Sequence, residues 1–127
     1  MDLKVYRLTF ESKGYEAQDI TAHIANVIRE SGLVNGIAVL YTNERGCSVT
    51  EIEYEPELLA DLEELLHKVG CVDKLLCNVI IGKNVFVPVV KGSMFLGQFK
   101  RIVFVDISRI EGSKSVVLVL EGVFKSS

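Results

Sequence analysis

The chain has 127 residues, of which 49% are hydrophobic, and its 14 basic and 17 acidic side chains leave a net charge of −3. This length fits a single domain, residues 1–127, with a core of its own, and the charge balance excludes a broad basic surface for nucleic acid or an anionic membrane. No apolar run approaches the roughly 18 residues of a membrane span, the start has no signal-peptide pattern, and the three cysteines form no Cys-x-x-Cys pair, so we expect a cytoplasmic protein.

The first part of the chain predicts strands around one helix. Residues 5–10 alternate apolar and polar side chains, which indicates a half-buried strand. A helix follows, for which we expect Thr21 as the N-cap and Gly32 just past the end. The continuous apolar run at 36–42 predicts a strand buried on both faces, and the alternation at 47–54 predicts another strand.

The second part predicts helices and then strands. Pro56 opens a helix whose leucines repeat at helical spacing up to Gly70, and residues 72–81 fit a further short helix. Closely spaced strands with short turns are then expected at 84–90, 94–96, 101–107 and 115–124. The predicted fold class is therefore α+β, a mostly antiparallel two-sheet β-sandwich with two to three helices.

Four strings in this order resemble the YjbQ family, whose members are often described as secondary thiamine-phosphate synthases or as uncharacterised. They are DIT before the first helix with SGLVNG after it, EYEPELLADLE at 53–63, the PV-x-x-G and LG segment at 88–97, and the closing LEG at 120–122. The resemblance spans nearly the whole chain. It implies the family's α+β sandwich and its usual homotrimer.

The chain departs from the family pattern where that pattern has histidines. One histidine position falls on Glu44, a second falls on Leu75, and the stretch that carries a third is much shortened. In the family these histidines resemble a metal-binding cluster, and a leucine has no lone pair to donate to a metal. The resemblance therefore implies a degenerate site, and we predict no metal ligands and no cofactor.

Two groups of charged residues are candidates for a remaining site. Glu44, Glu53 and Asp106 are the candidate catalytic carboxylates, because two carboxylates at close range shift one pKa upward and allow acid–base work. The alternative is that these three carboxylates are ordinary solvated charges at loops and strand ends. A basic cluster near glycines gives candidate ligand-binding residues for a phosphate-bearing molecule, with ordinary surface charge as the alternative: Lys100, Arg101 and Lys114.

The sequence leaves two functional hypotheses open and does not decide whether the protein is an enzyme. In the first, it is a divergent, non-catalytic YjbQ-like protein that binds a small anionic ligand in a pocket between subunits of a homotrimer. In the second, it is an enzyme with altered acid–base or thiamine-phosphate-related chemistry that uses the three carboxylates. The two hypotheses differ in what they require of Glu44, Glu53 and Asp106: only the second needs them to share one accessible site.

Overall fold

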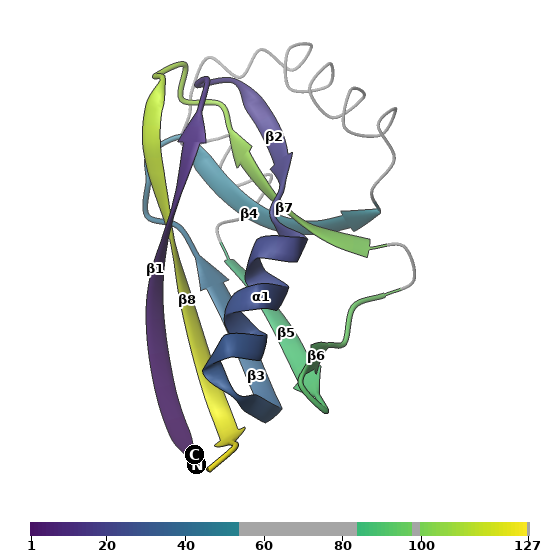
Figure 1. Ribbon diagram of the computed structural model, residues 1–127. Coiled ribbons are helices and arrows are strands. Elements are labelled where there is room, and N and C mark those ends of the chain that lie inside the picture. Colours follow the sequence, from purple (N-terminus) through teal and green to yellow (C-terminus); the bar gives the residue numbers. More distant parts are fainter. Residues whose placement is uncertain (54–83, 98–99, 127) are drawn as a thin grey trace.

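The computed structural model describes residues 1–53, 84–97 and 100–126 of the chain (Figure 1). In this part of the chain, eight strands and one helix follow one another in a regular order. The elements are β1 (Asp2–Ser12), β2 (Glu16–Asp19), α1 (Thr21–Ser31), β3 (Leu33–Tyr41), β4 (Cys47–Glu53), β5 (Asn84–Val90), β6 (Ser93–Met94), β7 (Lys100–Asp106) and β8 (Gly112–Phe124).

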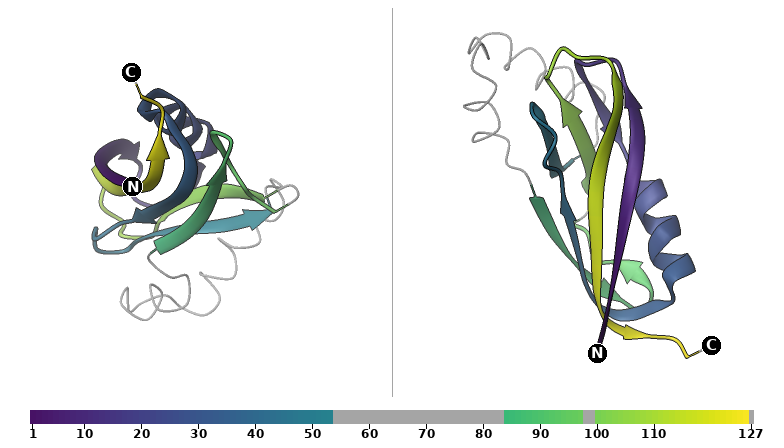
Figure 2. Two further views of the ribbon diagram at one scale, coloured as in Figure 1. Left: turned by 90° about the horizontal axis from the view of Figure 1, so that it is seen from below. Right: turned by 90° about the vertical axis from the view of Figure 1, so that its left-hand side faces the viewer.

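The strands form two antiparallel sheets. The larger sheet has the order β1-β8-β3-β5-β6, and the smaller sheet has the order β2-β7-β4. In Figure 1 the smaller sheet lies across the upper part of the larger sheet, and α1 lies in front of the lower part of the larger sheet. The turned views of Figure 2 show the same layers. The α+β sandwich expected from the sequence is confirmed, whereas the helices predicted at 56–70 and 72–81 lie outside the described residues.

One main core joins the helix to both sheets. Ile24 and Ile28 on one side of α1 are fully buried, since they lie four residues apart and share a face. They belong to one apolar cluster with Leu118 of the larger sheet and Phe104 of the smaller sheet. This packing holds β7, the central strand of the smaller sheet, against the core.

Two local expectations for the helix and for β3 are wrong. Ile20, not Thr21, is the N-cap of α1, because the Thr21 side chain is turned inward, where its Oγ1 accepts a hydrogen bond of 2.7 Å from the backbone N–H of Ile102. The strand predicted to be buried on both faces is buried on one face only. Ile37 and Tyr41 of β3 are exposed on the other face.

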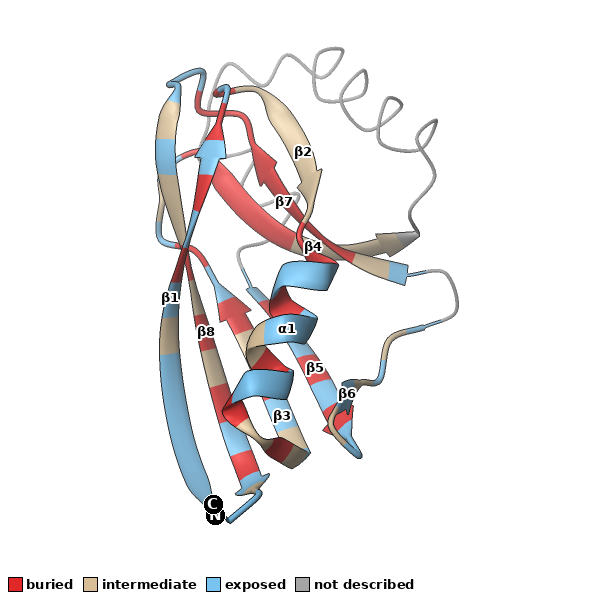
Figure 3. Ribbon diagram, in the orientation of Figure 1, coloured by how far each residue is buried: buried red, intermediate tan, exposed pale blue. Residues whose placement is uncertain are grey.

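The exposed face of the larger sheet, which we call the outer face, is mostly apolar. Paired residues of neighbouring strands share it: Val5 lies opposite Val119, which lies opposite Val39, which lies opposite Phe86. Figure 3 shows exposed positions alternating with buried ones along β5. Seven exposed large apolar side chains lie on this face: Leu3, Val5, Ile37, Tyr41, Phe86, Val90 and Val123.

Candidate functional site

The predicted site residues divide between the two ends of the smaller sheet. Asp106 ends β7 and pairs with Cys47 at the start of β4, whereas Lys100 begins β7 and pairs with Glu53 at the end of β4. Six residue steps along a strand span about 20 Å. The structure therefore brings Glu44, Asp106 and Lys114 to one end of the sheet and places Glu53, Lys100 and Arg101 at the other.

Asp106 is the centre of a buried polar group that we call the Asp106 cluster: Ser12, Cys47, Asp106, Ser108 and Lys114. Its carboxylate is 0% exposed. Oδ2 accepts a hydrogen bond of 2.6 Å from the hydroxyl of Ser12 and lies 4.0 Å from the ammonium of Lys114, and Oδ1 accepts one of 2.8 Å from the backbone N–H of Ser108. A buried charge with this many donors is fully compensated within the chain.

These contacts keep Asp106 ionised. Burial by itself raises the pKa of a carboxyl group, but the hydrogen bonds from Ser12, Ser108 and Cys47 stabilise the charged form. The pKa of Asp106 is therefore lowered from its ordinary value of 3.8. A carboxylate in this state accepts hydrogen bonds at neutral pH but neither holds nor exchanges a proton there.

The Cys47 thiol has the opposite tendency. Burial, followed by the charge of Asp106 and the hydrogen bond to it, raises the pKa of the thiol to about 12. Nucleophilic cysteines need the thiolate, and a thiol with this pKa stays protonated at neutral pH. Cys47 is therefore a buried strand residue rather than a nucleophile.

We therefore predict that native Cys47 does not react with thiol reagents. In a C71S/C77S variant, which leaves Cys47 as the sole cysteine of the chain, iodoacetamide at pH 8 is expected to give almost no labelling of the native protein. It should give complete labelling in denaturant, because only unfolding exposes the thiol. Mass spectrometry measures both; rapid labelling of the native variant would contradict the assignment.

Two glycine turns hold the loop after β7 against the Asp106 cluster. Gly46 has a φ of 80°, and a Cβ there would lie 2.7 Å from the Cα of Ser108. Gly14 has a φ of 94°, and a Cβ there would lie 2.8 Å from the backbone nitrogen of Ile110. Glycine is required at both positions for positive φ and for close approach. Two backbone hydrogen bonds join the loop after β7 to these turns, one from Ile107 N–H to the Gly46 carbonyl and one from Arg109 N–H to the Gly14 carbonyl.

Glu44 sits beside this cluster in the loop after β3. Its Oε2 accepts a hydrogen bond of 2.9 Å from the backbone N–H of Ser115, and its own N–H donates to Thr42 Oγ1 at 3.2 Å. Thr42 in turn donates to the carbonyl of Ser115 at 2.9 Å. The carboxylate thus joins the 42–44 loop to β8, and its charge is near enough to contribute to the raised pKa of Cys47.

The other candidates lie at the far end of the smaller sheet from the Asp106 cluster. Arg101 Nε donates to Asp19 Oδ2 at 2.9 Å, and Lys100 is exposed at the start of β7. The burial of Asp19 raises its pKa, but hydrogen bonds from Thr21 and Arg101 outweigh that effect and lower it. The backbone of Glu53 pairs with that of Lys100, and its side chain lies outside the described residues.

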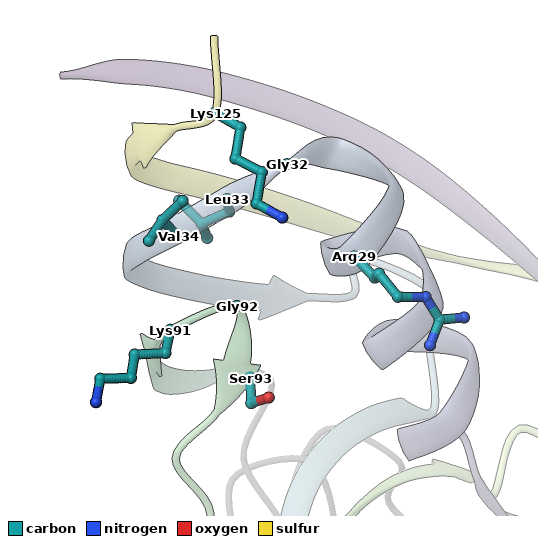
Figure 4. Close-up of a pocket in the computed structure, with 8 residues that line it drawn as sticks. All are labelled: Arg29, Gly32, Leu33, Val34, Lys91, Gly92, Ser93 and Lys125. Carbon is teal, nitrogen blue, oxygen red and sulfur yellow. The ribbon is translucent and has the colours of Figure 1, made fainter. Parts of the chain in front are cut away.

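A second feature, which we call the α1-end pocket, lies at the opposite pole, where α1 ends. It has a volume of about 430 Å³ and is lined by Arg29, Gly32, Leu33, Val34, Lys91, Gly92, Ser93 and Lys125. Figure 4 shows Arg29 on one rim and Lys91 on the other, with Lys125 extending between them. Nothing in the sequence indicates that residues 29, 91 and 125 lie close together, since they come from three separate segments.

The part of the chain that the structure describes contains no group of three or more His, Cys, Asp or Glu side chains arranged to hold a metal ion. His23 lies on α1 with its ring 5.1 Å from that of Phe10 in an edge-to-face contact. His67 is outside the described residues. None of the described helices is long and apolar enough to cross a membrane.

Comparison with known proteins places these features in a family. The model of the family described as "UPF0047 protein YjbQ-like" matches residues 6–122. A UPF0047 protein from Methanothermobacter thermautotrophicus is 30% identical over 109 residues, which covers 76% of each chain.

Solved structures show the same fold. A YbjQ-like protein of unknown function from Sulfolobus solfataricus superposes with a TM-score of 0.82 at 19% identity, covering 96% of this chain and all of the other. A hypothetical protein from Aeropyrum pernix gives a TM-score of 0.79 at 28% identity, with 97% of this chain and all of the other covered.

Proposed function

The chain belongs to the YjbQ-like UPF0047 family, and on that premise we propose that it is a self-associating, non-catalytic member of that family that binds a small anionic ligand. We place it in the cytoplasm, as the cysteine pattern suggests. The strongest support comes from the Asp106 cluster, in which the carboxylate that an acid–base enzyme would use is fully buried and saturated by donors of the chain itself.

The chemistry of this cluster argues against acid–base catalysis. A general acid or base needs a pKa near the operating pH and must reach the reacting atom directly or through one water. Asp106 meets neither condition, because its pKa is lowered and its side chain is 0% exposed. The backbone of Glu53 lies at the far end of β4 from Asp106. Glu53 therefore cannot share a site with Glu44 and Asp106 unless the strands move.

Self-association is supported by the outer face. A monomer rarely exposes a large contiguous apolar patch, whereas apolar side chains gathered on one surface are typical of subunit interfaces. Val5 and Phe86 are 59% and 60% exposed, and a row of β-branched residues joins them across the sheet. A second and third copy of the chain are the occupants we propose, as a homotrimer.

The mass in solution tests this assembly. We expect multi-angle light scattering after gel filtration to give three times the 14.1 kDa mass of one chain, and to hold that value on dilution to low micromolar concentration. A strictly monomeric mass would overturn the trimer, and a dimeric mass would keep the interface but correct the number of subunits.

A second candidate function is an enzyme with altered acid–base chemistry. It is favoured by the convergence of Glu44, Asp106 and Lys114 at one pole, where the charges of all three act on Cys47. Elemental analysis of purified protein separates the two. Stoichiometric, tightly bound zinc would favour the hypothesis that the protein is an enzyme, since a metal supplies reactivity that the buried Asp106 carboxylate lacks.

A further inference from the structure

We propose that the α1-end pocket is the anion site of this protein and that it takes the phosphate group of a small molecule. The inference rests on the proposed function, because it names the place where the anionic ligand binds. Three cationic side chains border the pocket, and none of the described residues that line it is acidic. A volume of about 430 Å³ falls in the range of small-molecule sites.

The cations are not needed to stabilise the end of α1. A helix ends with unpaired carbonyl groups and a partial negative charge, to which basic side chains are commonly attracted. Here three of the last four carbonyls already have donors: Ser31 Oγ on Ile28, Gly32 N–H on Arg29, and Lys4 Nζ on Ser31. Capping therefore does not explain the Lys91 and Lys125 side chains.

The backbone at Lys91 gives independent support. Lys91 and Gly92 form the two-residue turn between the paired residues Val90 and Ser93, with φ values of 51° and 82°. A hairpin turn with two positive φ values favours Asn-Gly, since a residue with a long side chain is strained there. The Lys91 N–H is held by Asn35 Oδ1 at 3.1 Å. The backbone conformation at this position favours asparagine, yet the residue is a lysine. We take this as an indication that the ammonium group has a function of its own.

Arg109 provides a matched comparison at the opposite pole. It is the other non-glycine residue with positive φ among the described residues, at 62°. Its guanidinium carbon lies 4.8 Å from the centre of the Tyr15 ring, so its cation has a local aromatic partner. Among the described residues no carboxylate forms an ion pair with Lys91, Arg29 or Lys125.

The pocket also adjoins the proposed subunit interface. Val34 and Lys91 line it, and their chain neighbours Asn35 and Val90 lie at the end of the outer face. Arg29 lies on the rim of the pocket that α1 forms, and its guanidinium donates a hydrogen bond to the side-chain oxygen of Asn26. A second copy on the outer face would wall one side of the pocket and exclude water, which strengthens the attraction between cations and a phosphate.

The substitution Lys91→Asn tests the site without damaging the turn, with Arg109→Asn as its control. Both remove one positive charge and relieve one strained φ. Inorganic phosphate is titrated against sodium chloride of equal ionic strength, with thermal shift and calorimetry as readouts. We expect the parent protein and Arg109→Asn to bind phosphate equally, and Lys91→Asn to bind it about three- to tenfold more weakly, as removal of a charged hydrogen-bond donor implies. Without phosphate, Lys91→Asn should melt no lower than the parent.

Three results would overturn the site: no phosphate effect beyond that of chloride in the parent protein, unchanged binding by Lys91→Asn, or equal losses in both variants. The mass of every sample is measured alongside. Unchanged phosphate binding by Lys91→Asn in an intact trimer removes this site but leaves an anion-binding oligomer. A monomeric protein that loses phosphate on Lys91→Asn keeps the site and removes the proposed assembly.

Discussion

Replacing Asp106 by alanine is expected to lower the free energy of unfolding by roughly 3–5 kcal/mol, because removal of one partner leaves the Lys114 ammonium and several donors buried without their acceptor. For a chain of this length the loss corresponds to a fall of about 10 °C or more in melting temperature. Urea unfolding at pH 7 measures the free energy, and calorimetry measures the melting temperature.

Two controls separate this cluster from an unspecific defect. Ser12→Ala removes only one donor to Asp106, and we expect a loss of about 1 kcal/mol. Asp106→Asn keeps the shape but presents an N–H₂ group to donors, so its cost should fall between the two. A loss below about 1 kcal/mol for Asp106→Ala would contradict the view that the carboxylate organises this end of the sandwich.

The pH dependence has a defined sign. The pKa of Asp106 is lower in the folded chain than the ordinary value of 3.8, so its contribution to stability is complete above about pH 4 and is lost as the pH falls through the folded-state pKa. The difference in free energy of unfolding between the parent and Asp106→Asn should therefore stay constant from pH 7 to pH 5 and shrink below pH 4. A difference that does not change down to pH 3 would contradict the lowered pKa.

The second large effect is expected from Phe86→Glu. Phe86 is 60% exposed on the outer face, so in an isolated chain the substitution should change the stability by less than about 0.5 kcal/mol. In an assembly that covers this face, the same glutamate would be an unpaired buried charge, which weakens association by roughly a hundredfold or more. We expect a folded monomer by light scattering, with an unchanged far-ultraviolet circular dichroism spectrum.

Phe95→Glu is the matched control for this experiment. Phe95 is 72% exposed but lies beyond β6 rather than on the outer face. It loses the same side chain and gains the same charge, so it should leave the mass unchanged. If Phe86→Glu remains fully associated, or if the two variants dissociate equally, the outer face is not the interface.

The pattern of apolar residues was sufficient for the fold class but not for the environment of β3. The run at 36–42 has the composition of a strand with two buried faces, and Ala38 and Leu40 are indeed buried. Ile37 and Tyr41 are as apolar as a second buried face requires, yet nothing within the described chain covers them. Periodicity reports which side chains avoid water; it does not distinguish burial within a chain from burial between copies.

The sequence shows which residues carry charge, but it does not show which strand ends lie next to each other in a sheet. Lys100 and Asp106 begin and end β7, and the antiparallel pairing of β7 with β4 places Glu53 beside Lys100 rather than beside Asp106. Strand register depends on contacts distant in sequence, so the candidate carboxylates could not be grouped correctly in advance. For the same reason Arg29, Lys91 and Lys125, which come from three separate segments, could not be recognised as one pocket.

The pairing of β1 with β8 has a consequence for biogenesis. Asp2 lies opposite Gly122 and Ser12 opposite Gly112, so β1 finds its partner only after the strands between them in the sequence have been synthesised. Since β8 also separates β1 from β3, a chain truncated before residue 112 would lack the strand that joins β1 to the rest of the larger sheet. Such non-local pairing slows folding and leaves the edges of β1 and β3 unpaired until β8 is available, so a chain that stops before residue 112 should yield insoluble product rather than a shortened working protein.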